Sequence, residues 1–222
     1  MQKHYEREVN HLNGLLFAQL DRIEHNARVV LSRPRDLDAS VDPFIPDRTV
    51  DQHEVVIEEE CLKIIALHQP LADELRWLVT VIKANRDLER IGDLLSDIFE
   101  LNMDHADLIK VLGEDGSDLL ALFSLSEEAV LHACTCLRER DSSLARKTWK
   151  AKKDLDDKFA ALLESLKKSL TQHTATALHV DAFVVVRNLD RMASHSANVA
   201  KEVLYLVDGE IVRHRGREVL GR

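Results

Sequence analysis

Residues 86–93 read Arg-Asp-Leu-Glu-Arg-Ile-Gly-Asp, and residues 187–194 read Arg-Asn-Leu-Asp-Arg-Met-Ala-Ser. The second stretch is a weaker copy of the first. Glu89 and Asp190 stand at matching positions, 101 residues apart (190 minus 89), which is nearly half of the 222-residue chain. A chain that repeats itself at half its length is predicted to contain two copies of one structural unit.

The composition favours helices over sheet. The chain has 7 glycines, 4 prolines and 5% aromatic residues. So few turn-forming residues mean few turns and therefore long elements, and the scarcity of aromatic residues argues against strands. The fold class predicted from the sequence is all-α.

Apolar periodicity predicts three long helices in each half. In residues 71–103 one apolar seam is continuous, and a second seam starts apolar and turns polar at Asn85 and Glu89. A helix with two seams packs against two neighbours, which predicts a three-helix bundle. The six expected helices are antiparallel and cover residues 3–31, a segment from Asp47 to the turn at Gln69-Pro70, 71–103, 119–139, 143–170 and 180–207.

The predicted architecture is two tandem, sequence-related three-helix bundles. The first bundle is expected over residues 1–110 and the second over residues 111–209, followed by a basic tail over 210–222. Two proline-bearing or glycine-bearing segments, 36–46 and 104–117, are expected to be a loop and the connection between halves. A threonine-rich turn is expected over residues 171–179.

Charge and cysteine content exclude several classes of protein. The net charge of −9 disfavours binding to nucleic acid, because phosphate backbones would be repelled. Three cysteines without framework spacing suggest a reducing compartment, and we interpret them as small core residues. The polar N-terminus shows no signal peptide, and no run reaches the roughly 18 apolar residues of a membrane span. We therefore expect a soluble, cytoplasmic protein.

Paired carboxylates are the main chemical feature of the first half. Glu89 and Asp93 stand four residues apart on one predicted helix, and Asp47 and Asp51 stand four apart on the preceding one. Oxygen ligands of this kind suit Mg²⁺, Ca²⁺ or Mn²⁺, and carboxylate bundles also hold iron. The alternative is a solvated acidic face with salt bridges along each helix, which is common.

Two motifs resemble those of a known family. Residues 69–76 read Gln-Pro-Leu-Ala-Asp-Glu-Leu-Arg and are followed by Asp-Leu-Glu-Arg-Ile-Gly-Asp at 87–93. Together they closely resemble the signature of the PhoU family of phosphate-homeostasis proteins, and residues 198–209 resemble the end of that family's last helix. The resemblance is strong over residues 47–100, moderate over 181–209, and weak in the first and fourth helices.

The resemblance implies two three-helix bundles that carry multinuclear iron or zinc clusters on repeated E(D)-x-x-x-D motifs. It also implies a cytoplasmic negative regulator that is a homodimer. Such a protein links the ATPase subunit of a phosphate ABC transporter to a sensor histidine kinase, and so reaches the membrane only through its partners. It keeps phosphate-starvation genes off when phosphate is plentiful.

Carried over by position, the resemblance predicts one complete metal site and one degenerate site. The first-site ligands are Asp47, Asp51, Glu89 and Asp93. In the second half only Asp156 and Asp190 remain, because Lys152 and Ser194 stand where acidic residues are expected. A lysine among the ligands should abolish or severely reduce binding of a hard cation, so the second site is predicted to be empty.

The remaining motifs point away from catalysis. The eleven histidines are scattered, without metal-protease or zinc-finger spacing, and we interpret His195 as a solvated residue and not a ligand. No glycine-rich phosphate loop or nucleophile–base pair is present, so we expect no enzyme activity. Two other functions stay open: an accessory of another phosphate transporter without transcriptional control, and a metal-storage or metal-dependent hydrolytic protein.

Overall fold

The computed structural model describes residues 2–31, 44–45, 47–101, 107, 111, 116–172 and 176–209. Side chains are described for all of these except 2, 47–52, 116, 117 and 172. The long elements of this part of the chain are all α-helices: α1 (Gln2–Leu31), α2 (Asp47–His68), α3 (Ala72–Leu101), α5 (Gly116–Glu139), α6 (Ser142–Gln172) and α7 (Ala177–Asp208). The predicted all-α class is confirmed.

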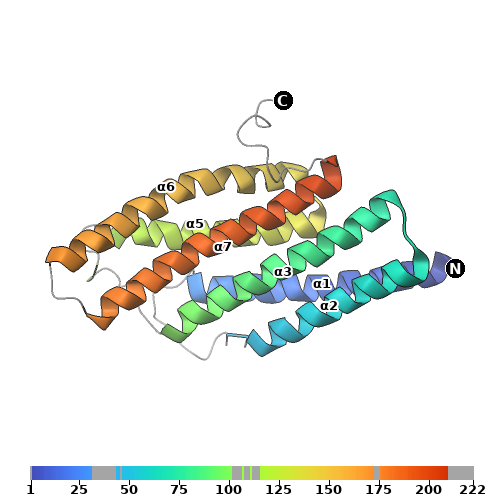
Figure 1. Cartoon of the computed structure of the whole chain (residues 1–222), viewed down its shortest axis with the longest axis horizontal. Coiled ribbons are helices and arrows are strands. Elements are labelled where there is room, and N and C mark those ends of the chain that lie inside the picture. Colours follow the sequence, from blue (N-terminus) through green and yellow to red (C-terminus); the bar gives the residue numbers. More distant parts are fainter. Residues whose placement is uncertain are drawn as a thin grey trace.

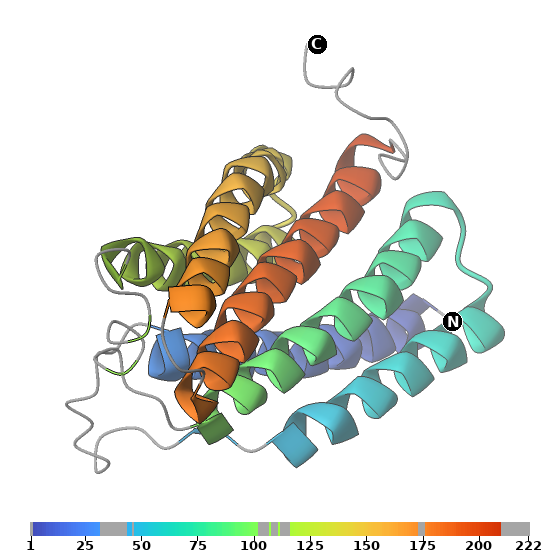
Figure 2. The ribbon, with the colours of Figure 1, turned by 60° about the vertical axis from the view of Figure 1, so that its left-hand side comes forward.

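The helices form two units of three that lie side by side. Helices α1, α2 and α3 pack on one another, and so do α5, α6 and α7. Helices α6, α7, α3 and α2 form one layer in that order, with α5 and α1 behind it (Figures 1 and 2). The two units meet mainly where α3 packs along α7, which makes this pair the centre of the molecule.

A single apolar core runs through both units. It contains the buried side of α1 and the continuous seam of α3 that the sequence predicts, and it extends through α5, α6 and α7 without a break. All three cysteines lie in it, as expected. Burial raises the pKa values of the Cys61 and Cys136 thiols to about 12, so both stay protonated and unreactive near neutral pH.

Polar contacts fix the register between α3 and α7. Asp87 Oδ1 accepts hydrogen bonds from His195 Nδ1 at 2.8 Å and from Asn198 Nδ2 at 3.2 Å. Further along the same pair of helices, Asn188 Nδ2 donates to Asp97 Oδ2 at 3.3 Å. By the 101-residue offset, Asp87 corresponds to Asn188 and Asp97 to Asn198. The two Asp–Asn bonds are therefore equivalent, and an approximate two-fold axis passes between α3 and α7.

Helix ends differ from the predicted ends by a few residues. Helix α7 begins at Ala177, inside the predicted turn. Thr176 is its N-cap residue, and the Thr176 hydroxyl lies 2.8 Å from Nδ1 of the His179 side chain and makes no hydrogen bond to the N–H groups of the helix. The predicted stop of that helix is correct. Gly209 adopts a left-handed conformation (φ 71°) and donates its N–H to Tyr205 O at 3.1 Å, which is a common way for a helix to end.

The segment before α2 is tied to α1. Asn26 donates through Nδ2 to Ile45 O and accepts from Ile45 N, both at 2.9 Å. The Phe44 ring stacks on that of Phe99, with centroids 4.4 Å apart. Most of the predicted loop over 36–46 lies outside the described residues, as does the tail 210–222. Near the predicted boundary at 110 only residues 107 and 111 are described, so that boundary stays a prediction.

Helix α5 is more apolar than the sequence interpretation assumed. Its stretch Asp118–Glu139 has a mean hydropathy of 1.3, and by length and composition alone it could cross a membrane. Half of the stretch is buried against the rest of the protein. A core helix has the same composition, so this is weak evidence for a membrane span.

Candidate metal centre

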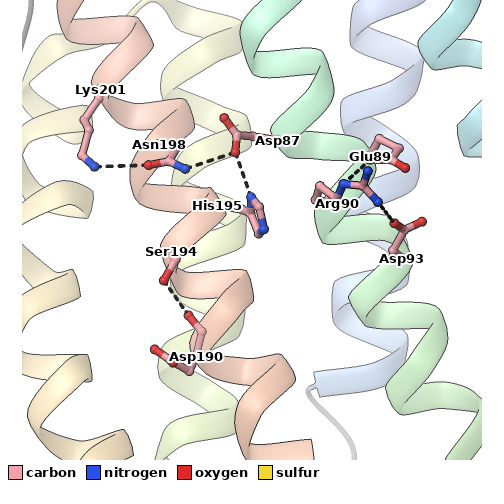
Figure 3. A network of polar contacts seen from close by, with 9 residues as sticks. All are labelled: Asp87, Glu89, Arg90, Asp93, Asp190, Ser194, His195, Asn198 and Lys201. Carbon is pink, nitrogen blue, oxygen red and sulfur yellow. Dashed lines mark hydrogen bonds and ion pairs between the residues drawn. The ribbon is translucent and has the colours of Figure 1, made fainter. Parts of the chain in front are cut away.

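The side of α3 that faces α2 carries the predicted carboxylates of the first site. Glu89 and Asp93 point to this side, whereas Asp87 points to the opposite side, towards α7 (Figure 3). Arg90 lies between the two carboxylates: its Nη1 donates to Asp93 Oδ2 at 2.8 Å, and its Nε lies 3.3 Å from Glu89 Oε2. The site is thus partly compensated by an arginine from its own helix.

Glu89 is the unusual member of this group. Its side chain is only 13% exposed, and Oε2 accepts no hydrogen bond within the described part of the chain. Burial raises the pKa of Glu89 to about 7, the charges of Asp93 and Glu54 add to the increase, and Arg90 opposes it. A buried carboxylate oxygen without a hydrogen bond is costly unless a proton or a cation compensates it.

The other two predicted ligands come from the start of α2. The side chains of Asp47 and Asp51 lie outside the described residues. The backbone register is nevertheless fixed, because Asn85 Nδ2 on α3 donates to Glu54 O on α2 at 2.9 Å. Since the helices are antiparallel, the turn with Asp51 lies about level with Glu89, and the turn with Asp47 lies about level with Asp93.

In the second half, a lysine stands between the two remaining carboxylates. Lys152 Nζ on α6 donates to Asp156 on the same helix and to Asp190 Oδ1 on α7, the latter at 3.1 Å. The other oxygen of Asp190 accepts from Arg187 Nη1 at 3.1 Å. Both oxygens of Asp190 therefore accept hydrogen bonds from cationic side chains, whereas the only cationic contact of Glu89 within the described residues is the ion pair of its Oε2 with Arg90.

Ser194, which stands where an acidic residue is expected, is engaged with its own helix. Its hydroxyl donates to the backbone carbonyl of Asp190 at 3.0 Å, one turn earlier on α7 (Figure 3). His195, the next residue of α7, points towards α3 and forms a hydrogen bond with Asp87. The sequence interpretation of His195 as a solvated residue missed this partner. The Asp87 network as a whole was missed, although Asp87 and Asn188 are matched positions of the repeat.

The described side chains alone do not make a complete metal site. Within that part of the chain, no three His, Cys, Asp or Glu side chains gather closely enough to hold an ion. Glu89 and Asp93 supply two oxygen donors that face α2, and any further donor must come from side chains beyond the described set. Both metal-site assignments therefore stay predictions.

A family model and the curated relatives of this chain name the same family. The family model described as the PhoU domain matches residues 35–101 and 119–203, once in each half. The Deinococcus radiodurans protein named "Phosphate-specific transport system accessory protein PhoU homolog" is 33% identical over 191 residues, which cover 82% of this chain and 84% of that protein. The Escherichia coli protein named "Phosphate-specific transport system accessory protein PhoU" is 27% identical over 180 residues, covering 79% and 73%.

Solved structures share the fold. The crystal structure of PhoU from Pseudomonas aeruginosa superposes with a TM-score of 0.66 at 24% identity, covering 94% of this chain and 98% of that one. The phosphate transport system regulatory protein PhoU from Streptococcus pneumoniae superposes with a TM-score of 0.64 at 18% identity. The domain match in both halves, together with a relative of 33% identity over most of its length, means that this chain belongs to the PhoU family.

Proposed function

We propose that this protein is an accessory and regulatory protein of a phosphate transport system. The observation that carries the proposal is the PhoU domain in both halves, shared with relatives named as accessory proteins of phosphate-specific transport. In the proposed role, the protein links the ATPase subunit of a phosphate ABC transporter to a sensor histidine kinase. It represses the phosphate-starvation response when phosphate is plentiful.

The role is that of an adaptor and not of an enzyme. The long helices of the described part of the chain offer several exposed faces to partners, and helix faces are a common means of protein recognition. The proposal places the protein in the cytoplasm as a homodimer, associated with the membrane through the transporter. Relatives named as accessory proteins support an adaptor better than a hydrolase.

The first acidic site is proposed to bind a metal ion or an iron or zinc cluster. Glu89 fits such a role, because its Oε2 is buried without a hydrogen bond and burial raises the pKa of its carboxyl to about 7, so that a bound cation would compensate a charge that the protein itself compensates poorly. Asp93 and, from α2, Asp47 and Asp51 would complete an all-oxygen set suited to hard cations or iron. A bound cation would neutralise these carboxylates and tie α2 to α3.

Measuring the metal content of purified variants tests whether the first or the second acidic site binds metal. We expect the Glu89→Ala/Asp93→Ala variant to lose most of the metal that co-purifies with the wild type. Changes near ligands alone lower metal affinity by about 10–100-fold, so removal of two ligands should exceed that range. The matched control is Asp156→Ala/Asp190→Ala, which should keep the wild-type content. Equal metal content in all three proteins, measured by elemental analysis, would exclude the first site.

The regulatory role is tested by alkaline phosphatase activity in a deletion strain of the source organism grown in excess phosphate. We expect high activity in the deletion strain and low activity after complementation with the wild-type gene. Complementation with Glu89→Ala/Asp93→Ala then shows whether the first site takes part in signalling. Low activity in the deletion strain itself would contradict the regulator and favour an accessory of another phosphate transporter, provided that no paralogue substitutes.

A further inference from the structure

One face of α2 carries a stripe of three apolar residues and one glutamate that points directly away from the bundle. It consists of Val55, Glu59, Leu62 and Ala66, spaced by four, three and four residues, and we call it the α2 outer stripe. All four side chains are exposed, Val55 by 54% and Leu62 by 53%. The opposite face of the same helix, with Ile57, Cys61 and Ile64, is fully buried.

The spacing of the α2 outer stripe is that of a helix-pairing seam. Positions that alternate at intervals of three and four are the a and d positions through which helices pack together, and three of the four here are apolar, with Glu59 as the charged exception. Helix α2 packs only on α1 and α3 to any extent, and it lies at the edge of the helical layer (Figure 2). Within the described part of the chain, no helix covers the outer stripe.

The charges around the stripe select for a basic partner. Glu58 flanks it and Glu59 lies within it; both are exposed, and neither has a hydrogen bond or ion pair with a described residue. Lys63 is the cation on the other flank, but its Nζ lies 3.0 Å from Glu60 and 3.7 Å from Glu8, so its charge is already compensated. With Glu58 and Glu59 uncompensated by any described residue and Lys63 already paired, the surface around the stripe is net acidic, which complements a helix with basic flanks.

We propose that the α2 outer stripe docks an amphipathic α-helix of a partner protein, with an apolar seam flanked by lysine or arginine. The proposal rests on the adaptor role, because an adaptor needs an uncovered surface for its partner. A second copy of this chain fits less well, since an antiparallel pair of stripes would bring two copies of Glu59 close together. An anionic membrane surface would be repelled by Glu58 and Glu59.

A synthetic peptide tests the chemistry of the surface. The probe is a labelled helical peptide of about three heptads, long enough to be helical, with leucine in the seam and lysine on both flanks. Its binding to the full chain is followed by fluorescence anisotropy. Leu62→Ser should weaken binding by about tenfold or more, as expected for a central anchor. Leu120→Ser is the matched control, an exposed leucine on α5 that should leave binding unchanged.

Charge reversal tests the selectivity of the surface. Glu58→Lys/Glu59→Lys should lose the lysine-flanked peptide and gain a peptide of the same seam with glutamate flanks. Equal binding of the first peptide to wild type and Leu62→Ser would overturn the proposal, as would an equal loss in Leu120→Ser. Leu62-dependent binding to phosphatidylglycerol vesicles, or a Leu62-dependent dimer in sedimentation, would overturn it in favour of a membrane or a second copy.

Complementation of the deletion strain separates this proposal from the proposed function. If wild type restores low phosphatase activity and Leu62→Ser does not, at equal protein level, both proposals are supported. If both genes restore low phosphatase activity, the proposal that the α2 outer stripe docks a partner is wrong and the regulatory role stands. If wild type itself does not restore it, the regulatory role fails, and the peptide assay then decides on the surface alone.

Discussion

Replacing Glu89 by glutamine is expected to stabilise the metal-free protein at pH 8 and to leave it nearly unchanged at pH 5. The pKa of Glu89 is raised to about 7 in the folded protein, first by burial and then by its acidic neighbours. Between pH 4.5 and pH 7 the folded protein therefore retains a proton that the unfolded chain has released, so stability falls as pH rises through this range. The loss amounts to about 3 kcal/mol, and glutamine avoids it.

Urea unfolding in the presence of a chelator at both pH values measures this effect. The control is Glu100→Gln on the same helix, whose side chain is exposed and should show the same difference from wild type at pH 5 and pH 8. A Glu89→Gln variant with no gain at pH 8 would mean that the carboxylate is compensated in the folded protein. Added metal should reverse the order, because only the wild type has the charge to bind it.

Truncation of the central leucines should have an effect of similar size. Leu88 and Leu189 occupy matched positions of α3 and α7, and both are fully buried. Replacing either by alanine is expected to lower the free energy of unfolding by about 2–5 kcal/mol, through lost burial and the cavity that remains. The two variants should lose similar amounts, because each leucine lies at the same place in its own bundle.

The number of transitions in the urea unfolding curves of the Leu88→Ala and Leu189→Ala variants is also predicted. One core joins both bundles, so each variant should unfold in a single transition by urea, shifted as a whole. Leu120→Ala, at an exposed position of α5, should change stability by no more than about 0.5 kcal/mol. Two separate transitions, only one of which moves, would show that the bundles are independent folding units.

Most of the fold could be predicted from the sequence because helix periodicity extends over long segments. The continuous seam of α3 is buried as predicted, and the low content of glycine and proline correctly indicated the long helices of the described part of the chain. The start of α7 was missed, because Thr176 and His179 in a threonine-rich segment were interpreted as a turn. Local sequence also does not reveal which seams meet, so the long contact of α3 with α7 was not predicted.

The candidate site was less predictable than the fold. The spacing of Glu89 and Asp93 predicted that both lie on one face of a helix, and in the structure they do. Spacing carries no information on how deeply either side chain is buried. The partner of Lys152 could be guessed from its position among carboxylates. The Asp87–His195 bond could not, because it joins residues 108 apart in the chain across the contact between the two bundles.

The matched Asp–Asn bonds between α3 and α7 determine which half can pair with which. If two first halves met through this contact, Asp87 of one would face Asp97 of the other, and two carboxylates would repel each other. In the native pairing each aspartate meets an asparagine instead, Asn198 or Asn188. A pair of first halves is thus disfavoured at this contact relative to the native pair of unlike halves, so the contact reinforces the covalent fusion of the two halves.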